Sequence, residues 1–114
     1  MLLNQMVEHT SLDTVFQALA HPSRRAMLNA LRGGERTVGE LAAPHSMSFA
    51  GASKHVKVLE RAGLLVRDVR GRTHVCRLDA AGLEQVRDWV ETYRVFWNER
   101  LDALQTVLQD EENP

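Results

Sequence analysis

The sequence predicts a mainly α-helical domain that carries one small β-hairpin. Three observations indicate this class. Most of the chain falls into amphipathic helical patterns that are separated by Gly, Pro or Ser. Residues 64–78 instead form two short strand-like runs around a central glycine. The length of 114 residues suits a single domain with one core, residues 1–114.

The first two helices are predicted from caps and apolar spacing. A helix over residues 11–20 begins at a serine cap and follows an N-terminal arm over residues 1–10. Pro22 suits the first turn of the second helix, and two glycines stop this helix after Leu31. The residues of the second helix that we expect in the core are Ala26, Met27, Ala30 and Leu31.

The next two helices are joined by a short turn. The capping-box motif Thr-Val-Gly-Glu starts the third helix, and Pro44 ends it. Ser48 caps the fourth helix, which runs to Ala62 before a glycine stop. This arrangement over residues 37–62 predicts a helix-turn-helix.

A hairpin and a long helix complete the chain. Strands are expected at residues 64–68 and 73–78, with a turn around Gly71 between them. A helix-turn-helix followed by such a hairpin is a winged helix-turn-helix, and residues 64–78 are its wing. The fifth and last helix is expected over residues 81–109.

Positive charge is concentrated in one third of the chain. The whole sequence has a net charge of −1. Residues 46–78 contain seven Lys or Arg and two Asp or Glu, which is a net charge of +5, and the remainder carries −6. A basic segment of this kind is typical of a nucleic-acid-binding surface, although the total charge hides it.

The fourth helix has an apolar face and an opposite face that suits a DNA major groove. The residues expected to face the core are Phe49, Ala52, Val56 and Leu59. The opposite face has small residues near its start and cations further along, as approach to base edges and phosphates requires. A charged helix face is more often only solvated surface, but the turn, the small residues and the basic wing favour DNA. The predicted DNA-binding residues are Ser48, Ala50, Gly51, Ser53, Lys54, His55, Lys57, Arg61, Arg70 and Arg72.

Several of these residues have two interpretations. Gly51 allows close approach either to DNA or to the preceding helix, and His55 is either half-buried or a phosphate contact. The arginines on either side of Gly71 are expected in a minor groove or on its phosphates. Cations on the strands, Arg67 and Arg77, are expected to protect a sheet edge from aggregation.

The last helix carries an apolar stripe that is rich in aromatic residues. Such a stripe is either the lid of the domain or a subunit interface, and two Trp, one Tyr and one Phe exceed what a lid requires. A two-fold dimer through the first and last helices is therefore favoured, with two recognition helices spanning a pseudo-palindromic DNA site. The predicted interface residues are Leu12, Val15, Phe16, Val86, Trp89, Val90, Tyr93, Phe96, Trp97, Leu101 and Leu104.

Three segments together resemble the ArsR family of bacterial winged-helix transcriptional repressors. They are ALAHPSRRAMLNAL, TVGELA and SKHVKVLERAGLLVRDVRGRTHVCRLD. The resemblance covers about residues 12–108 and implies a homodimeric protein that binds an operator, often that of its own gene. The ending YRVFWNERLDAL is similar to a subgroup often encoded beside small lipid-binding-like proteins. Where many members have Gln followed by Ser or Pro, this chain has Phe49 and Ala50, so Ser53 and Lys54 are expected to carry more of the base readout.

No metal, other cofactor or catalytic site is expected. A single cysteine, Cys76, excludes an intramolecular disulfide and a zinc site built on several thiolates. The chain resembles the members of this family that do not sense metals. Metal-sensing members have a Cys-rich motif in the first helix of the helix-turn-helix, or Asp and His ligands on the last helix. Here residues 40–45 lack thiols and no histidine follows His74. The sequence also shows no phosphate loop, no paired carboxylates at a plausible site and no nucleophile with a nearby base, so an enzyme is not expected.

The remaining expectations concern location and alternatives. The sequence has no apolar run of membrane-spanning length and no secretory signal, so a cytoplasmic address is expected. The main alternative function is a winged-helix module that binds an acidic protein. RNA binding is a weaker alternative, because the basic segment lacks a set of aromatic side chains on which RNA bases stack. The sequence does not identify an effector, which could be a small apolar molecule, a partner protein or none.

Overall fold

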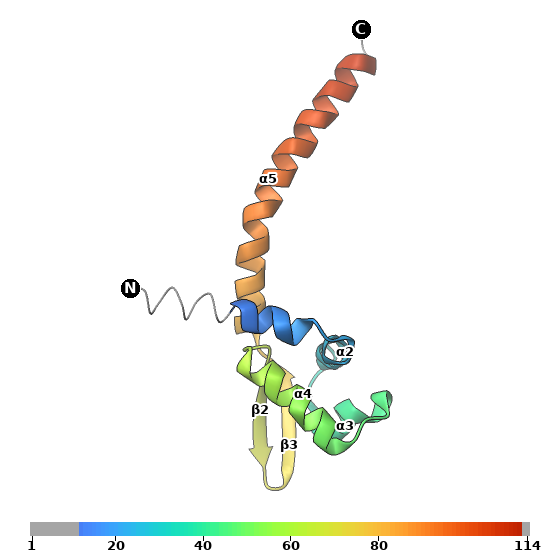
Figure 1. The fold of residues 1–114 in the computed structure, drawn as a ribbon, viewed down its shortest axis with the longest axis vertical. Helices are drawn as coiled ribbons and strands as arrows, with labels where there is room; N and C mark the ends of the chain where they lie inside the picture. Colours follow the sequence, from blue (N-terminus) through green and yellow to red (C-terminus); the bar gives the residue numbers. More distant parts are fainter. Residues whose placement is uncertain (1–11, 113–114) are drawn as a thin grey trace, which may run out of the picture. The chain divides into compact units, whose positions relative to one another are not determined.

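The computed structural model describes residues 12–112, which divide into two compact units. The first unit ends at Glu84 and the second begins at Gln85, within the last helix. The predicted N-terminal arm and the Ser11 cap lie outside the described residues. The elements in chain order (Figure 1) are a helix over residues 12–19, α2 (Pro22–Leu31), β1 (Arg36–Thr37), α3 (Val38–Ala42), a 3-10 turn (Ala43–His45), α4 (Phe49–Arg61), β2 (Leu65–Arg70), β3 (Thr73–Leu78) and α5 (Ala80–Glu112).

This element order confirms the predicted class, a mainly helical winged helix-turn-helix. Both predicted caps of the helix-turn-helix form. The Thr37 hydroxyl accepts a hydrogen bond from the backbone N–H of Glu40 at 3.1 Å, and the Glu40 carboxylate accepts one from the Thr37 N–H at 3.0 Å. The Ser48 hydroxyl accepts from the N–H of Gly51 at 3.0 Å. These bonds satisfy N–H groups that have no partner inside the helix, so each helix starts where its motif stands.

The sheet has one more strand than the sequence analysis predicted. Its order is β1-β3-β2, and both pairings are antiparallel. β1 is only two residues long and pairs with Val75 and Cys76 of β3. A two-residue strand has no alternation to detect, so only the tertiary pairing reveals it. β2 also extends to Arg70, and the turn narrows to Gly71-Arg72, with Gly71 at φ 66°.

Side chains from the helices and strands of the first unit form one core. The buried apolar residues are Val15, Ala18, Met27, Leu31, Val38, Leu41, Ala42, Ala52, Val56, Leu59, Ala62, Leu64, Leu65 and Cys76. Burial raises the pKa of the Cys76 thiol, which keeps this side chain protonated.

Three predictions about burial are wrong. Val15 was expected at a dimer interface but is 0% exposed, so it packs the core of its own chain. Ala30 is exposed, because the buried face of α2 is centred on Met27 and Leu31. Phe49 was expected in the core but is 60% exposed. It is the first residue of α4 and precedes the turn at which this helix reaches the core.

The start of α5 lies against the turn that follows α4. Gly63 has φ 70° and stops α4 as predicted. Its carbonyl accepts a hydrogen bond from the N–H of Gly82 at 2.7 Å. A Cβ atom on Gly82 would lie 2.5 Å from the carbonyl oxygen of Ala62, which is closer than any side chain can approach. Glycine at position 82 therefore permits this backbone contact.

The second unit consists of the remainder of α5. The whole helix has 33 residues, about 50 Å at 1.5 Å per residue, and it extends beyond the predicted range at both ends. Its large apolar side chains are about half exposed along one stripe, for example Tyr93 at 49% and Leu101 at 58%. Among the described helices, none combines the length and apolarity that crossing a membrane requires.

Candidate nucleic-acid interface

The exposed face of α4 carries three cations. Lys54, Lys57 and Arg61 are exposed, whereas Ala52, Val56 and Leu59 on the opposite face are buried. Within residues 12–112, none of the three cations forms an ion pair. Their charges are therefore available to an external anion, such as a phosphate group.

Small residues surround the beginning of the same face. Ser48 and Ala50 are exposed, and Gly51 and Ser53 are half-buried. A Cβ atom on Gly51 would meet the Ser48 hydroxyl at 3.3 Å and nothing else within 4 Å. Packing against the preceding helix therefore does not explain Gly51. The printed contact is with the Ser48 cap of its own helix, and the site leaves room for an external partner.

His55 lies toward α2 instead of among the exposed cations. Its ring centroid is 4.6 Å from that of His21, and its Nδ1 is 3.3 Å from Nη1 of Arg24. Partial burial lowers the pKa of His55, and the nearby His21, Arg24 and His45 lower it further. These contacts favour the half-buried interpretation of His55 over a phosphate contact.

The two arginines next to Gly71 have different environments. Arg70 donates two hydrogen bonds of 3.4 Å to the Glu35 carboxylate and lies 3.9 Å from Asp68. Arg72 is exposed and makes no ion pair within the part of the chain that the structure describes. Arg72 is therefore available to an anion, whereas Arg70 must first leave Glu35.

Further along the strands, the cations are partnered by neighbouring carboxylates. Arg67 is 3.0 Å from Glu60 of α4, and Arg77 is 3.6 Å from Asp68. These pairs link the hairpin to α4 and the two strands to each other. The pairs give both arginines a structural role. The expected protection of a sheet edge stays a prediction for Arg67 on the edge strand β2, whereas Arg77 lies on the central strand β3.

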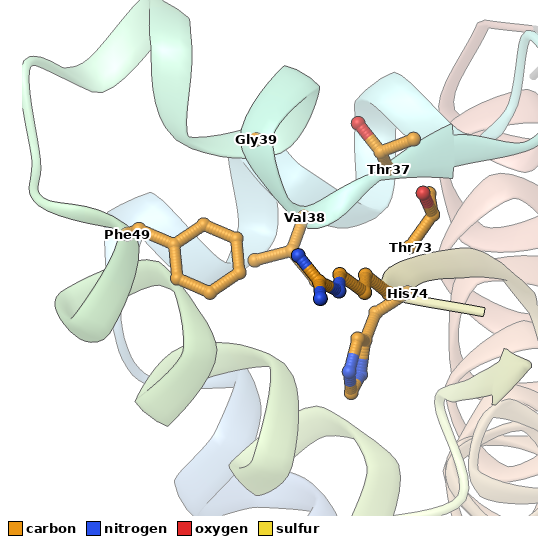
Figure 2. Close-up of a pocket in the computed structure, with 7 residues that line it drawn as sticks. Thr37, Val38, Gly39, Phe49, Thr73 and His74 are labelled. Atoms are coloured by element: carbon orange, nitrogen blue, oxygen red, sulfur yellow. The ribbon is translucent and has the colours of Figure 1, made fainter. Parts of the chain in front are cut away.

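A cleft of about 360 Å³ separates the wing from the first residues of α3 and α4. Its lining residues are Thr37, Val38, Gly39, Phe49, Arg72, Thr73 and His74. Figure 2 shows the Phe49 ring pointing into this cleft toward Val38, with Thr73 and His74 on the opposite side. The fold therefore brings the start of α4, the predicted recognition helix, and the wing to one surface, which we call the wing–helix cleft.

Part of this surface is not predicted by the sequence pattern. Helical spacing places Phe49 in the core, and it gives Thr37, Gly39 and Glu35 no part in the site. The position of Phe49 directly after a cap was the available signal, because the first helical turn commonly lies outside the core. The pairing of Glu35 with Arg70 spans 35 positions and has no local signal.

The predicted dimer residues, apart from Val15, lie in partly or largely exposed positions. Leu12 and Val86 are half-buried, and Phe16 is 37% exposed. The predicted interface residues on α5 are 43–58% exposed, namely Trp89, Val90, Tyr93, Phe96, Trp97, Leu101 and Leu104. So many half-exposed apolar side chains on one helix are typical of a surface that is covered in an assembly.

Residues that could bind a metal do not cluster. Across residues 12–112, no group of three or more His, Cys, Asp or Glu side chains has a metal-binding arrangement. The geometry of the site is therefore best described by its free cations, small residues and one exposed aromatic ring.

Comparisons with known proteins agree with this description. A family described as a helix-turn-helix domain matches residues 19–68. The HTH-type transcriptional regulator Rv2034 of Mycobacterium tuberculosis is 34% identical over 106 residues, which cover 93% of this chain and 96% of that protein.

Two solved structures share the fold. The ArsR family transcriptional regulator RHA00566 is 35% identical with a TM-score of 0.73, over 78% of this chain and 92% of that one. A homodimeric winged helix-turn-helix DNA-binding domain, Mb0332 of Mycobacterium bovis, is 26% identical with a TM-score of 0.62, over 86% and 88% of the two chains. The chain belongs to the ArsR family of winged helix-turn-helix transcriptional regulators.

Proposed function

We propose that this protein is a homodimeric repressor that binds a pseudo-palindromic operator in double-stranded DNA. The observation that carries this proposal is a set of cations on the two parts of the winged helix-turn-helix that form no ion pair within residues 12–112. Lys54, Lys57 and Arg61 lie on α4 and Arg72 lies in the wing. DNA is the common partner that offers phosphates along a groove wide enough for a helix.

Each part of the surface has its own role in this function. α4 lies in the major groove, where Ala50 and Ser53 approach base edges and Lys57 and Arg61 neutralise phosphates. Lys54 reaches either a base or a phosphate. Arg72 contacts the adjacent minor groove or its phosphates, as a cation on a thin hairpin can.

Dimerisation follows from the apolar stripe of α5. Two copies that cover this stripe would hold two recognition helices about one DNA turn apart. The homodimeric relative Mb0332 supports this assembly. Operator occupancy would exclude other proteins from the same DNA, and a bacterial operator places the repressor in the cytoplasm. The proposed mechanism needs neither catalysis nor a cofactor, and it leaves an effector open.

DNA binding is tested with the DNA upstream of the protein's own gene. We expect log affinity to fall linearly with log salt concentration, because phosphate neutralisation releases counterions. Lys57→Ala should reduce the slope by roughly one for each subunit. The matched control is Arg87→Ala, which removes an exposed cation that is paired with Asp88 on α5.

A salt-independent affinity, or equal effects of Lys57→Ala and Arg87→Ala, would contradict the proposed interface. Binding to an acidic protein without any DNA binding would instead support an interaction module.

A further inference from the structure

Phe49 is exposed at a position where the fold does not require an aromatic residue. It is the first residue of α4, directly after the Ser48 cap, and 60% of its surface is accessible. The core of the first unit is closed by other residues of the same helix, namely Ala52, Val56 and Leu59. Leaving most of a phenyl ring in water forgoes the stabilisation that its burial would provide. The ring therefore has surface available for an external partner.

The surroundings of Phe49 specify the chemistry of that partner. The ring lines the wing–helix cleft together with His74 (Figure 2). Arg72 also lines this cleft, and Lys54 and Lys57 follow Phe49 on α4. Arg72, Lys54 and Lys57 form no ion pair with any residue that the structure describes. An apolar ring next to such cations suits a ligand that is anionic along its length and has an apolar group nearby. Duplex DNA has this combination at each thymine, whose C5-methyl group projects into the major groove. The DNA phosphates are anionic, and the thymine C5-methyl group is the apolar group that base pairs present in this groove.

We propose that Phe49 is a specificity-determining residue that recognises the C5-methyl group of a thymine in the operator. This inference rests on the proposed function, because it requires α4 to lie in the major groove. The N-terminal residues of a recognition helix are those that approach base edges most closely. Phe49 makes no hydrogen bond through its side chain, so it distinguishes thymine by apolar contact alone.

The test removes the methyl group without changing base pairing. Each thymine of the footprinted operator is replaced in turn by deoxyuridine, and the dissociation constants are measured at one salt concentration. At the thymine that Phe49 contacts, we expect the wild-type protein to bind about fourfold more weakly after the replacement. This is the loss of affinity that corresponds to removing one buried methyl group. Phe49→Ala should bind thymine and uracil operators equally at this position. Phe49→Leu keeps an apolar side chain and should retain part of the preference.

A matched control distinguishes this contact from a general effect of exposed apolar residues. Val69 is 62% exposed in β2 and is absent from the lining of the cleft. Val69→Ala should keep the fourfold preference at that thymine. Circular dichroism of each variant checks that the fold is intact.

The outcomes separate the two proposals. A wild-type protein that binds the operator but tolerates every uracil replacement overturns the role of Phe49 and leaves the proposed function standing. A preference that persists unchanged in Phe49→Ala also overturns it, because another residue then reads the methyl group. A wild-type protein that binds no duplex DNA overturns both proposals. Binding of an acidic protein that is lost in Phe49→Ala would also overturn the role of Phe49 in reading thymine.

Discussion

At the residue scale, Gly82 is the glycine that has the least space for a Cβ atom. Its N–H donates to the carbonyl of Gly63, and a Cβ atom would lie 2.5 Å from the oxygen of Ala62 and 3.0 Å from that of Gly63. Both obstacles are backbone atoms, which cannot move aside as the end of a side chain can. A substitution here must displace the start of α5 or the turn after α4.

We therefore expect Gly82→Ala to lower the free energy of unfolding by about 1–3 kcal/mol, the usual cost of overpacking. Urea denaturation measures this change. Gly39→Ala is the control, because its Cβ would lie 3.9 Å from the nearest atom, the Thr37 hydroxyl. The control should be neutral or slightly stabilising, as alanine favours a helix. Equal stabilities of the two variants would contradict the close approach.

His55 makes stability depend on pH. Partial burial, followed by the charges of His21, Arg24 and His45, holds the pKa of this imidazole below its usual value of 6.5. The unfolded chain therefore binds the proton more readily than the folded chain. The contribution of His55 is fully present above pH 6.5 and is lost as the pH falls through the interval below it.

The corresponding variant is His55→Gln, which cannot titrate in this range. The melting temperature of the wild type should fall more steeply than that of His55→Gln between about pH 6.5 and pH 5. If the melting temperatures of the two proteins fall equally with pH over this interval, the folded and unfolded states have the same affinity for the proton at His55.

At the scale of elements, Arg70 of the wing is paired with a carboxylate from outside the wing, which would compete with DNA phosphates. Glu35, in the connection before β1, holds Arg70 through two hydrogen bonds, and Asp68 lies close to the same guanidinium group. Both partners are exposed, so this pair contributes little to stability. Its consequence concerns binding, because a phosphate must replace the carboxylate.

We expect Glu35→Gln to tighten operator binding and to increase the salt slope by up to about one for each subunit, since Arg70 becomes available. Glu84→Gln removes the same charge from an exposed position at the start of α5 and serves as the control. Affinity and its salt dependence are measured by fluorescence anisotropy. Weaker binding of Glu35→Gln than of the control would mean that Glu35 orients Arg70 instead of competing for it.

At the scale of the whole molecule, the exposed apolar stripe of α5 favours packing against a second chain. Within the chain, Trp89 and Tyr93 have ring centroids 5.0 Å apart, and Phe96 and Trp97 are 5.5 Å apart. These ring contacts still leave the side chains about half exposed. A long helix with such a face gains most of its stability from packing against another surface.

Trp97→Glu places a charge within this stripe and should convert the proposed dimer to a monomer in analytical ultracentrifugation. Operator affinity should then fall at least tenfold, because two recognition helices no longer bind together. Asp102→Lys changes charge on the polar side of the same helix and should remain dimeric. A dimeric Trp97→Glu protein would assign dimerisation to another surface.

The sequence alone determined the elements whose causes are local. The capping motifs at Thr37 and Ser48, the glycine after α4 and the glycine in the wing set the ends of helices and the turn of the hairpin, and each was predicted. The basic segment and the family resemblance also come from the sequence. Such features depend on residues within a few positions of one another, so a linear pattern contains them.

Only the tertiary structure decided which faces meet. It added β1 to the sheet, moved Val15 into the core, exposed Phe49 in the wing–helix cleft and paired Arg70 with Glu35. Each of these outcomes depends on where distant segments come together. Helical periodicity states that a residue lies on one side of its helix, but the neighbouring elements determine whether that side is covered.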